Sequence, residues 1–145
     1  MAASLVVDAS VAIKWYLEEE DRELARRLIT GEPERPLIAP DLIVAEIGNI
    51  LWKRHRQGSL TAADAARLAE APQDPRRFPL DLVPSTQVLP QALRIAVECD
   101  RSVYDSLYIA LAVANNTAMI TADARLANAL SATPYAANVR LLRDA

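Results

Sequence analysis

The spacing of apolar residues alternates along the chain between short continuous runs, typical of buried strands, and a repeat of three to four residues, typical of helices. Residues 4–7 form such a run, Ser4-Leu5-Val6-Val7, and it ends at Asp8, which predicts a strand buried on both faces. Similar runs predict strands over residues 37–39, 80–83, 118–121 and 139–142. Asp81 interrupts the third of the five runs and marks it as a half-exposed edge strand.

Helical periodicity fills the segments between the strands. The clearest example begins after Asp41, a predicted N-cap, and ends at Gly58. Its core-facing stripe consists of Ile43, Ile47, Ile50 and Leu51. The other predicted helices cover residues 11–17, 18–31, 61–71, 86–99, 103–115 and 124–131.

Small polar residues mark three of the helix starts. Ser10, Thr61 and Ser102 each precede a predicted helix, and each can accept a hydrogen bond from a backbone N–H in its first turn. Because Ser10 supplies the cap of the first helix, the carboxylate of Asp8 is left without a capping role.

Strands thus alternate with helices, which predicts a three-layer α/β fold in which helices cover a mostly parallel sheet with right-handed crossovers. Pro33 and Pro36 predict a loop before the second strand. The 145 residues contain no internal repeat and no linker long enough to divide them, so we expect a single domain over residues 1–145.

Four acidic residues lie outside the carboxyl ends of the strands, where parallel sheets of this kind usually have their binding and catalytic sites. Asp8 follows the first strand and Asp123 follows the fourth. Glu46 lies early in the helix after the second strand, at the margin of its apolar stripe. Asp105 lies in the first turn of the most apolar helix, which must be well buried. The four carboxylates are therefore expected to converge.

Each acid also has a purely structural explanation. Aspartate favours turns, which accounts for Asp8, and Asp105 completes a capping box at the start of its helix. Asp123 is placed to cap the helix that follows it, and Glu46 is placed to pair on the surface with Lys53. Taken singly these explanations remain open, and the combination at one sheet edge favours a functional site.

Several carboxylates brought together repel one another, and their pKa values rise unless a cation neutralises them. A ligand set of oxygen atoms suits Mg²⁺ or Mn²⁺, which keep several waters and bridge substrate phosphates. The chemistry that follows is hydrolysis of a phosphodiester by a metal-activated water, with a second ion at the leaving oxygen where two are bound.

The segments around these acids resemble the motifs of the PIN-domain nucleases, most closely the VapC-type ribonuclease toxins of prokaryotic toxin-antitoxin pairs. The resemblance covers nearly the whole chain and is carried by Val6-Val7-Asp8-Ala9-Ser10, Ala45-Glu46-Ile47-Gly48-Asn49, Tyr104-Asp105-Ser106-Leu107-Tyr108-Ile109-Ala110-Leu111-Ala112 and Ile120-Thr121-Ala122-Asp123. The third segment is the most specific.

The resemblance implies a PIN-like three-layer fold with sheet order 3-2-1-4-5 and an Mg²⁺-dependent endoribonuclease, with Mn²⁺ as a substitute ion. It implies metal-binding, catalytic carboxylates at Asp8, Glu46, Asp105 and Asp123. It implies supporting side chains in the hydroxyls of Ser10 and Thr121, which would orient the carboxylates or the metal waters, and in Asn49, which would line the pocket. The implied partners are RNA as substrate, a second copy in a homodimer, and a VapB-type antitoxin whose tail blocks the site.

The charge balance first argues against this substrate. Nineteen acidic residues against sixteen basic ones leave a formal net charge of −3, whereas nucleic-acid binding has a basic footprint. Removing the four proposed metal ligands leaves fifteen acids against sixteen bases, so the rest of the protein is formally +1. The negative charge is therefore expected in one pocket that needs a cation before it accepts a phosphate.

Other features bear on location and on candidate contacts. A single cysteine, Cys99, no charged-then-apolar leader and no apolar run near the ~20 residues of a spanning helix predict a cytoplasmic protein that does not cross a membrane. His55 lies in the basic run 53–56 near a helix end and is interpreted as solvated. Arg76, Arg77 and that basic run are candidate contacts to an RNA backbone.

Alternative functions make different demands on the sequence. A signalling receiver needs a lysine after its last strand, and residues 139–142 offer none. A phosphatase with an aspartate nucleophile needs a second aspartate two positions after Asp8, where Ser10 stands. An RNA-processing PIN nuclease without a toxin role and a non-enzymatic binding module both stay open.

Overall fold

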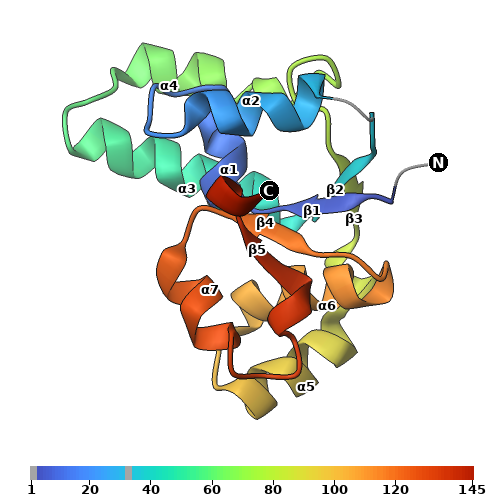
Figure 1. Ribbon diagram of the computed structural model, residues 1–145. Coiled ribbons are helices and arrows are strands. Elements are labelled where there is room, and N and C mark those ends of the chain that lie inside the picture. The colour runs from blue at the N-terminus through green and yellow to red at the C-terminus, as the bar shows by residue number, and fades with distance from the viewer. Residues whose placement is uncertain (1–2, 32–33) are drawn as a thin grey trace.

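The computed structural model describes residues 3–31 and 34–145, and a parallel sheet lies at its centre (Figure 1). Its strands are β1 (Leu5–Val7), β2 (Leu37–Pro40), β3 (Asp81–Val83), β4 (Met119–Thr121) and β5 (Val139–Leu141). Their spatial order is β3-β2-β1-β4-β5, and every neighbouring pair is parallel. The strand order and the α/β class expected from the sequence are confirmed.

Helices cover both faces of the sheet. They are α1 (Ala9–Ala12), α2 (Arg22–Thr30), α3 (Leu42–Arg56), α4 (Ala62–Leu68), α5 (Leu89–Cys99), α6 (Val103–Ala114) and α7 (Ala124–Leu130). Figure 1 shows α1 to α4 above the sheet and α5 to α7 below it, which makes three layers. In the described residues no helix is long and apolar enough to cross a membrane.

The core surrounds β1, β4 and α6. Every residue of both strands is buried, as a run of apolar residues in a central parallel strand requires. In α6 the seven consecutive residues from Ser106 to Ala112 are all buried, so this helix is held firmly against the sheet. The edge strand β3 is partly exposed, as Asp81 predicts.

The first helix differs from its prediction. The cap is Asp8, whose extended backbone precedes Ala9 and whose carboxylate accepts a hydrogen bond from the Val11 N–H at 3.1 Å. Ser10 lies inside the first turn, so its assignment as N-cap is wrong. The helix starts two residues earlier than predicted because the chain turns immediately at the end of β1, and a 3₁₀ segment, Ile13–Trp15, continues it.

Two further boundary predictions are corrected. Asp41 makes no capping bond to α3, because its carboxylate accepts hydrogen bonds from the N–H and hydroxyl of Ser85 after β3. Helix α2 begins at Arg22 rather than at Glu18, after Asp21 adopts a left-handed backbone with φ of 63°. The predicted caps Thr61 and Ser102 are confirmed. Of the predicted loop residues, Pro33 lies outside the described residues.

Candidate active site

A pocket of about 480 Å³ opens at the carboxyl end of the sheet, between β1, the first half of α3, the start of α6 and the end of β4. All four predicted acids line it, namely Asp8, Glu46, Asp105 and Asp123. Residues separated by up to 115 positions therefore meet, because parallel strands bring their carboxyl ends to one edge.

Asp8 is the most deeply placed of the four acids, with only 7% of its surface exposed. Its Oδ1 atom accepts a hydrogen bond from the Ser10 hydroxyl at 2.6 Å and the capping bond from the Val11 N–H. Burial raises the pKa of this carboxyl to about 6, since desolvation disfavours the charged form more than the hydrogen bonds favour it, and the nearby Glu46 adds a repulsion. Asp8 is thus both a helix cap and a pocket residue.

The hydroxyls of Ser10 and Thr121 connect β1 to the loop after β4. Ser10 Oγ lies 3.4 Å from Thr121 Oγ1 and accepts a hydrogen bond from the Ala122 N–H at 2.9 Å. Thr121, fully buried behind the pocket, accepts a hydrogen bond from the Asp123 N–H at 3.1 Å. These two hydroxyls hold the backbone around Asp8 and Asp123 in one arrangement.

Glu46 reaches the pocket from α3 and meets a tyrosine there. The Tyr108 hydroxyl donates a hydrogen bond of 2.5 Å to Glu46 Oε1. Burial raises the pKa of Glu46, the bond from Tyr108 opposes that rise, and the charge of Asp105 adds to it. The surface pairing with Lys53 proposed for Glu46 is replaced by this bond.

Asp105 and Asp123 lie nearer the solvent. The Asp105 backbone N–H donates to the Ser102 hydroxyl at 3.1 Å, and its carboxylate lies 3.4 Å from the Arg101 guanidinium. The Asp123 carboxylate accepts hydrogen bonds from the Arg125 and Leu126 N–H groups and so caps α7. The capping explanation for Asp123 is therefore correct, and the same carboxylate lines the pocket.

Comparison with known proteins decides the family. The PIN domain family profile matches residues 5–129. Ribonuclease VapC3 of Pyrobaculum aerophilum is 34% identical over 123 residues, which are 85% of this chain and 92% of that protein. VapC ribonuclease Mb0985 of Mycobacterium bovis is 36% identical over 124 residues, 86% of this chain and 89% of the relative. The chain is a PIN-domain protein of the VapC type.

Solved structures agree with this assignment. The crystal structure of PAE2754 from Pyrobaculum aerophilum is similar, with a TM-score of 0.66 and 26% identity over 99% of this chain and 86% of that one. A toxin-antitoxin complex from Klebsiella pneumoniae has a TM-score of 0.58 over 95% of this chain and 97% of that one, and at 11% identity it shares the fold alone. The receiver and phosphatase alternatives are set aside by the family membership.

The donor chemistry of this PIN-domain pocket fits a hard divalent cation. Its ionisable ligands are carboxylates, two of which have raised pKa values because they are buried near other negative charge. Asp8 accepts hydrogen bonds from Ser10 and Val11 at Oδ1. In the part of the chain that the structure describes, however, no three acidic, histidine or cysteine side chains stand close enough to hold an ion as they are. An Mg²⁺ ion can be held by one or two carboxylates, with water molecules as its other ligands.

Three further residues line the pocket of the PIN domain. The sequence indicates no pocket role for Tyr104 or Tyr108, and Lys53 is expected from it only as a surface partner of Glu46 or an RNA contact. Tyr108 lies three positions after Asp105, one turn along α6, so helical spacing places both on one face. Lys53 lies seven positions after Glu46 on α3, also on one face, and lines the mouth as the pocket's cation. Tyr104 lines the pocket with 64% of its surface exposed. Asn49 lies where the resemblance implies, in the pocket wall.

The four residues of the basic run 53–56, near the end of α3, have different neighbours in the fold. Arg54 pairs with Glu19, and the Arg56 guanidinium lies 5.0 Å from the ring centre of Trp52. The ring of His55 forms a hydrogen bond with the carbonyl of Leu60 at 3.0 Å and stays exposed, outside the pocket. Only Lys53 of this run contacts the pocket.

Proposed function

We propose that this VapC-type PIN-domain protein is an Mg²⁺-dependent endoribonuclease and the toxin of a VapBC-type toxin-antitoxin pair. The observation that carries the proposal is the meeting of four carboxylates, from four separate segments of the chain, in one pocket at the carboxyl end of the sheet. The proposal is further supported by the relatives named as VapC ribonucleases.

Asp8, Glu46, Asp105 and Asp123 are the proposed catalytic and metal-binding residues. A divalent ion held there supplies Lewis acidity toward a phosphate oxygen and lowers the pKa of a bound water. Mg²⁺ is the favoured ion because all four donors are hard oxygen ligands, and Mn²⁺ is the expected substitute.

The surrounding residues prepare the carboxylates for this role. Ser10 helps to fix the rotamer of Asp8 by donating to Oδ1. Tyr108 holds Glu46 and favours its charged form. Lys53 at the mouth supplies a positive charge that attracts the RNA phosphate, and Asn49 offers an amide beside it.

A cleavage assay tests the enzymatic part of the proposal. RNA cleavage is expected with Mg²⁺, with loss in excess EDTA, and Asp8→Asn or Asp105→Asn should reduce the rate by at least a hundredfold with the fold intact. Asp81→Asn, at an exposed carboxylate on β3 outside the pocket, is the matched control and should keep the wild-type rate. Full activity in EDTA contradicts the metal mechanism.

Asp123 needs its own variants because its carboxylate also caps α7. Asp123→Asn keeps an oxygen for capping and removes the charge, whereas Asp123→Ala removes both. A role in metal binding predicts that both variants lose activity while only the alanine variant loses stability. Wild-type activity in Asp123→Asn would restrict this residue to capping.

A growth experiment tests the toxin role. Expression of the wild type should arrest growth, expression of Asp8→Asn should not, and co-expression of a cognate VapB-type antitoxin should restore growth. Normal growth with soluble, RNA-cleaving protein favours the RNA-processing alternative. A VapB-type antitoxin and a second copy of this chain are the proposed protein partners. Sedimentation equilibrium tests whether the protein forms the homodimer.

A further inference from the structure

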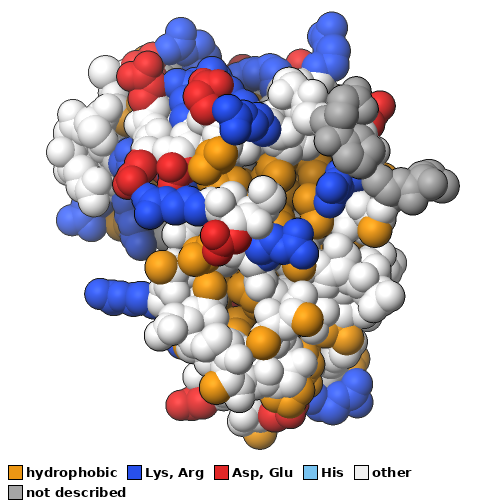
Figure 2. Space-filling model, viewed as in Figure 1, with side chains coloured by type: hydrophobic (Ala, Val, Ile, Leu, Met, Phe, Trp, Pro, Cys, Tyr) orange, Lys and Arg blue, Asp and Glu red, His pale blue; other side chains and the backbone are white. Residues whose placement is uncertain are grey.

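A second pocket, of about 310 Å³, lies beside α2 and shares no lining residue with the candidate active site. Four leucines form its apolar floor. They are Leu5 in β1, Leu24 and Leu28 in α2, and Leu142 after β5. Leu5 and Leu142 are buried, and the two leucines of α2 are half-buried. On the face shown in Figure 2, hydrophobic side chains are exposed beneath α2 between separate basic groups.

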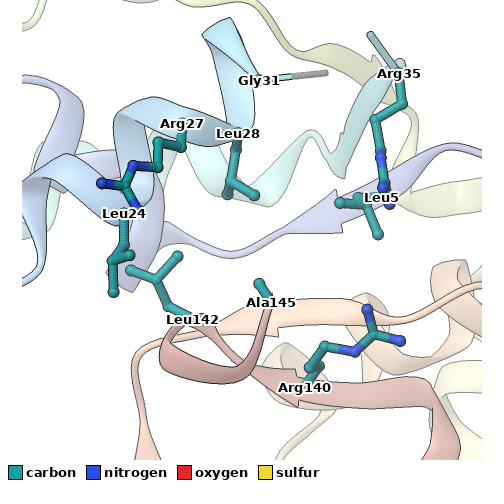
Figure 3. Close-up of a pocket in the computed structure, with 9 residues that line it drawn as sticks. All are labelled: Leu5, Leu24, Arg27, Leu28, Gly31, Arg35, Arg140, Leu142 and Ala145. Carbon is teal, nitrogen blue, oxygen red and sulfur yellow. The ribbon is translucent and has the colours of Figure 1, made fainter. Parts of the chain in front are cut away.

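Three arginines surround this floor. Arg27 comes from α2, Arg35 from the segment before β2, and Arg140 from β5. In Figure 3, Arg35 and Arg140 approach from opposite sides, and their guanidinium groups point toward the same space beside Leu5. Among the residues described, no aspartate or glutamate side chain lines this pocket. The described lining therefore contains three arginine side chains and no aspartate or glutamate side chain.

These arginines differ from half of those in the chain. Of its fourteen arginines, seven form ion pairs with carboxylates, namely Arg22, Arg26, Arg54, Arg67, Arg76, Arg101 and Arg143. Within the ranges 3–31 and 34–145, Arg27, Arg35 and Arg140 form none. Glu34, the neighbour of Arg35, lines an adjoining hollow to which Arg35 also contributes, and these two described residues form no ion pair with each other. Unpaired arginines gathered around one floor create a local potential that attracts anions.

We infer that this pocket binds an acidic peptide segment of a partner protein, in which aspartate or glutamate side chains flank an aliphatic one. Arginine forks match carboxylates through paired hydrogen bonds, and the leucine floor accepts the aliphatic side chain between them. The pocket has room for a few side chains rather than for a folded surface. RNA is the less suitable ligand, because no described lining residue has an aromatic ring on which a base could stack.

Fluorescence anisotropy with a labelled hexapeptide of alternating glutamate and leucine tests the inference, using metal-free protein in EDTA. The peptide is expected to bind, and Arg35→Gln or Arg140→Gln should each raise its Kd about tenfold through loss of a charge-assisted hydrogen bond. Arg94→Gln is the matched control, since Arg94 is exposed on α5, outside this pocket. Circular dichroism confirms that the variants fold.

Two ligand comparisons complete the test. A peptide with glutamine in place of glutamate should bind at least tenfold more weakly, and an unlabelled 2′-O-methyl oligoribonucleotide should displace the acidic peptide poorly. No binding, equal affinity for the neutral peptide, or a Kd unchanged by both arginine substitutions overturns the inference. Stronger displacement by the oligoribonucleotide also overturns it, in favour of an RNA contact.

Methyl NMR locates the peptide independently of the substitutions. Peptide binding should shift the methyl signals of Leu24, Leu28 and Leu142, which line the pocket, and leave those of Leu93 on α5 unchanged. Shifts confined to other leucines overturn the inference. Because no step measures RNA cleavage, failure of this inference is distinguishable from failure of the proposed nuclease.

Discussion

At the scale of single residues, the pocket is shaped by side chains that perform two tasks at once. Asp8 and Asp123 each cap a helix and present a carboxylate to the pocket. Both tasks depend on a small acid directly after a strand, where the chain turns into a helix. The structural and functional explanations of these acids are therefore compatible. The sequence left open whether each acid serves the local fold or the site, and in the structure one carboxylate can do both.

Asp8 should make the stability of the metal-free protein depend on pH. Its pKa is raised from 3.8 to about 6 in the folded protein, so the folded state binds the proton more tightly than the unfolded state does. Stability is thus present below pH 4 and is lost as the pH rises to 6, by about 3 kcal/mol for this group.

Urea unfolding in EDTA at pH 4 and pH 7.5 measures this loss. Asp8→Asn keeps the capping oxygen and cannot ionise, so its stability should fall by about 3 kcal/mol less than that of the wild type between these pH values. Asp81→Asn serves as the control and should follow the wild type. Equal pH dependence in Asp8→Asn would contradict the raised pKa.

Tyr108 should act as a positioning residue for Glu46. Tyr108→Phe removes the bond that favours the charged carboxylate, so the pKa of Glu46 should rise further. We expect cleavage to fall about tenfold or more at neutral pH, and the rising limb of the pH–rate profile to move to higher pH. A structural role alone would lower stability without moving the profile.

The matched control for this substitution is Tyr135→Phe. The Tyr135 hydroxyl donates a hydrogen bond of 2.7 Å to Glu98, so the control removes a tyrosine–glutamate bond of the same kind outside the pocket. It should retain the wild-type rate and profile.

At the scale of elements, α6 positions more of the site than any single strand. Its N-terminus carries Asp105, its second turn carries Tyr108, and its middle is buried against the sheet. The apolar run that makes this helix conspicuous in the sequence is what prevents it from moving relative to β1 and β4. Burial of α6 therefore fixes the position of two pocket residues.

The N-cap of α6 should contribute measurably to stability. Ser102→Ala removes the acceptor of the Asp105 N–H and should cost about 1 kcal/mol, a fall in Tm of a few degrees. Thr61→Ala removes the same kind of cap from α4, a helix with no buried residue. Its effect on global unfolding should be smaller, because α4 can fray without opening the core. Equal losses in thermal melts would contradict this distinction.

At the scale of the whole molecule, charge is distributed unevenly. Four acids share one pocket, while Arg27, Arg35 and Arg140 share another in which no described residue has an acidic side chain. The formal net charge of −3 is thus the sum over an acidic pocket, a basic pocket and the rest of the surface. An anionic substrate and a divalent cation are expected at the first, and an acidic peptide at the second.

Metal binding at the acidic pocket should stabilise the whole fold. At pH 7.5, Mg²⁺ at 100 times its Kd should raise the free energy of unfolding by about 3 kcal/mol, because it binds only the folded protein. The same Mg²⁺ should leave Asp8→Asn nearly unchanged, whereas Asp81→Asn should respond like the wild type. Differential scanning calorimetry measures the shift, and an equal rise in Asp8→Asn would place the ion elsewhere.

The sequence by itself determined the alternation of strands and helices, the buried strand ahead of Asp8 and the buried helix after Asp105, because these follow from local periodicity and from the apolar character of each segment. It also identified the four acids, and the resemblance of their flanking segments implied the strand order that the structure confirms.

Only the tertiary structure decided which group each polar atom meets. The bond from Tyr108 to Glu46 joins residues 62 positions apart, and Asp41 binds Ser85 instead of capping its own helix. The second pocket likewise joins residues from both ends of the chain. Such contacts depend on the packing of helices against a shared sheet, and periodicity along one segment carries no information about its neighbour in space.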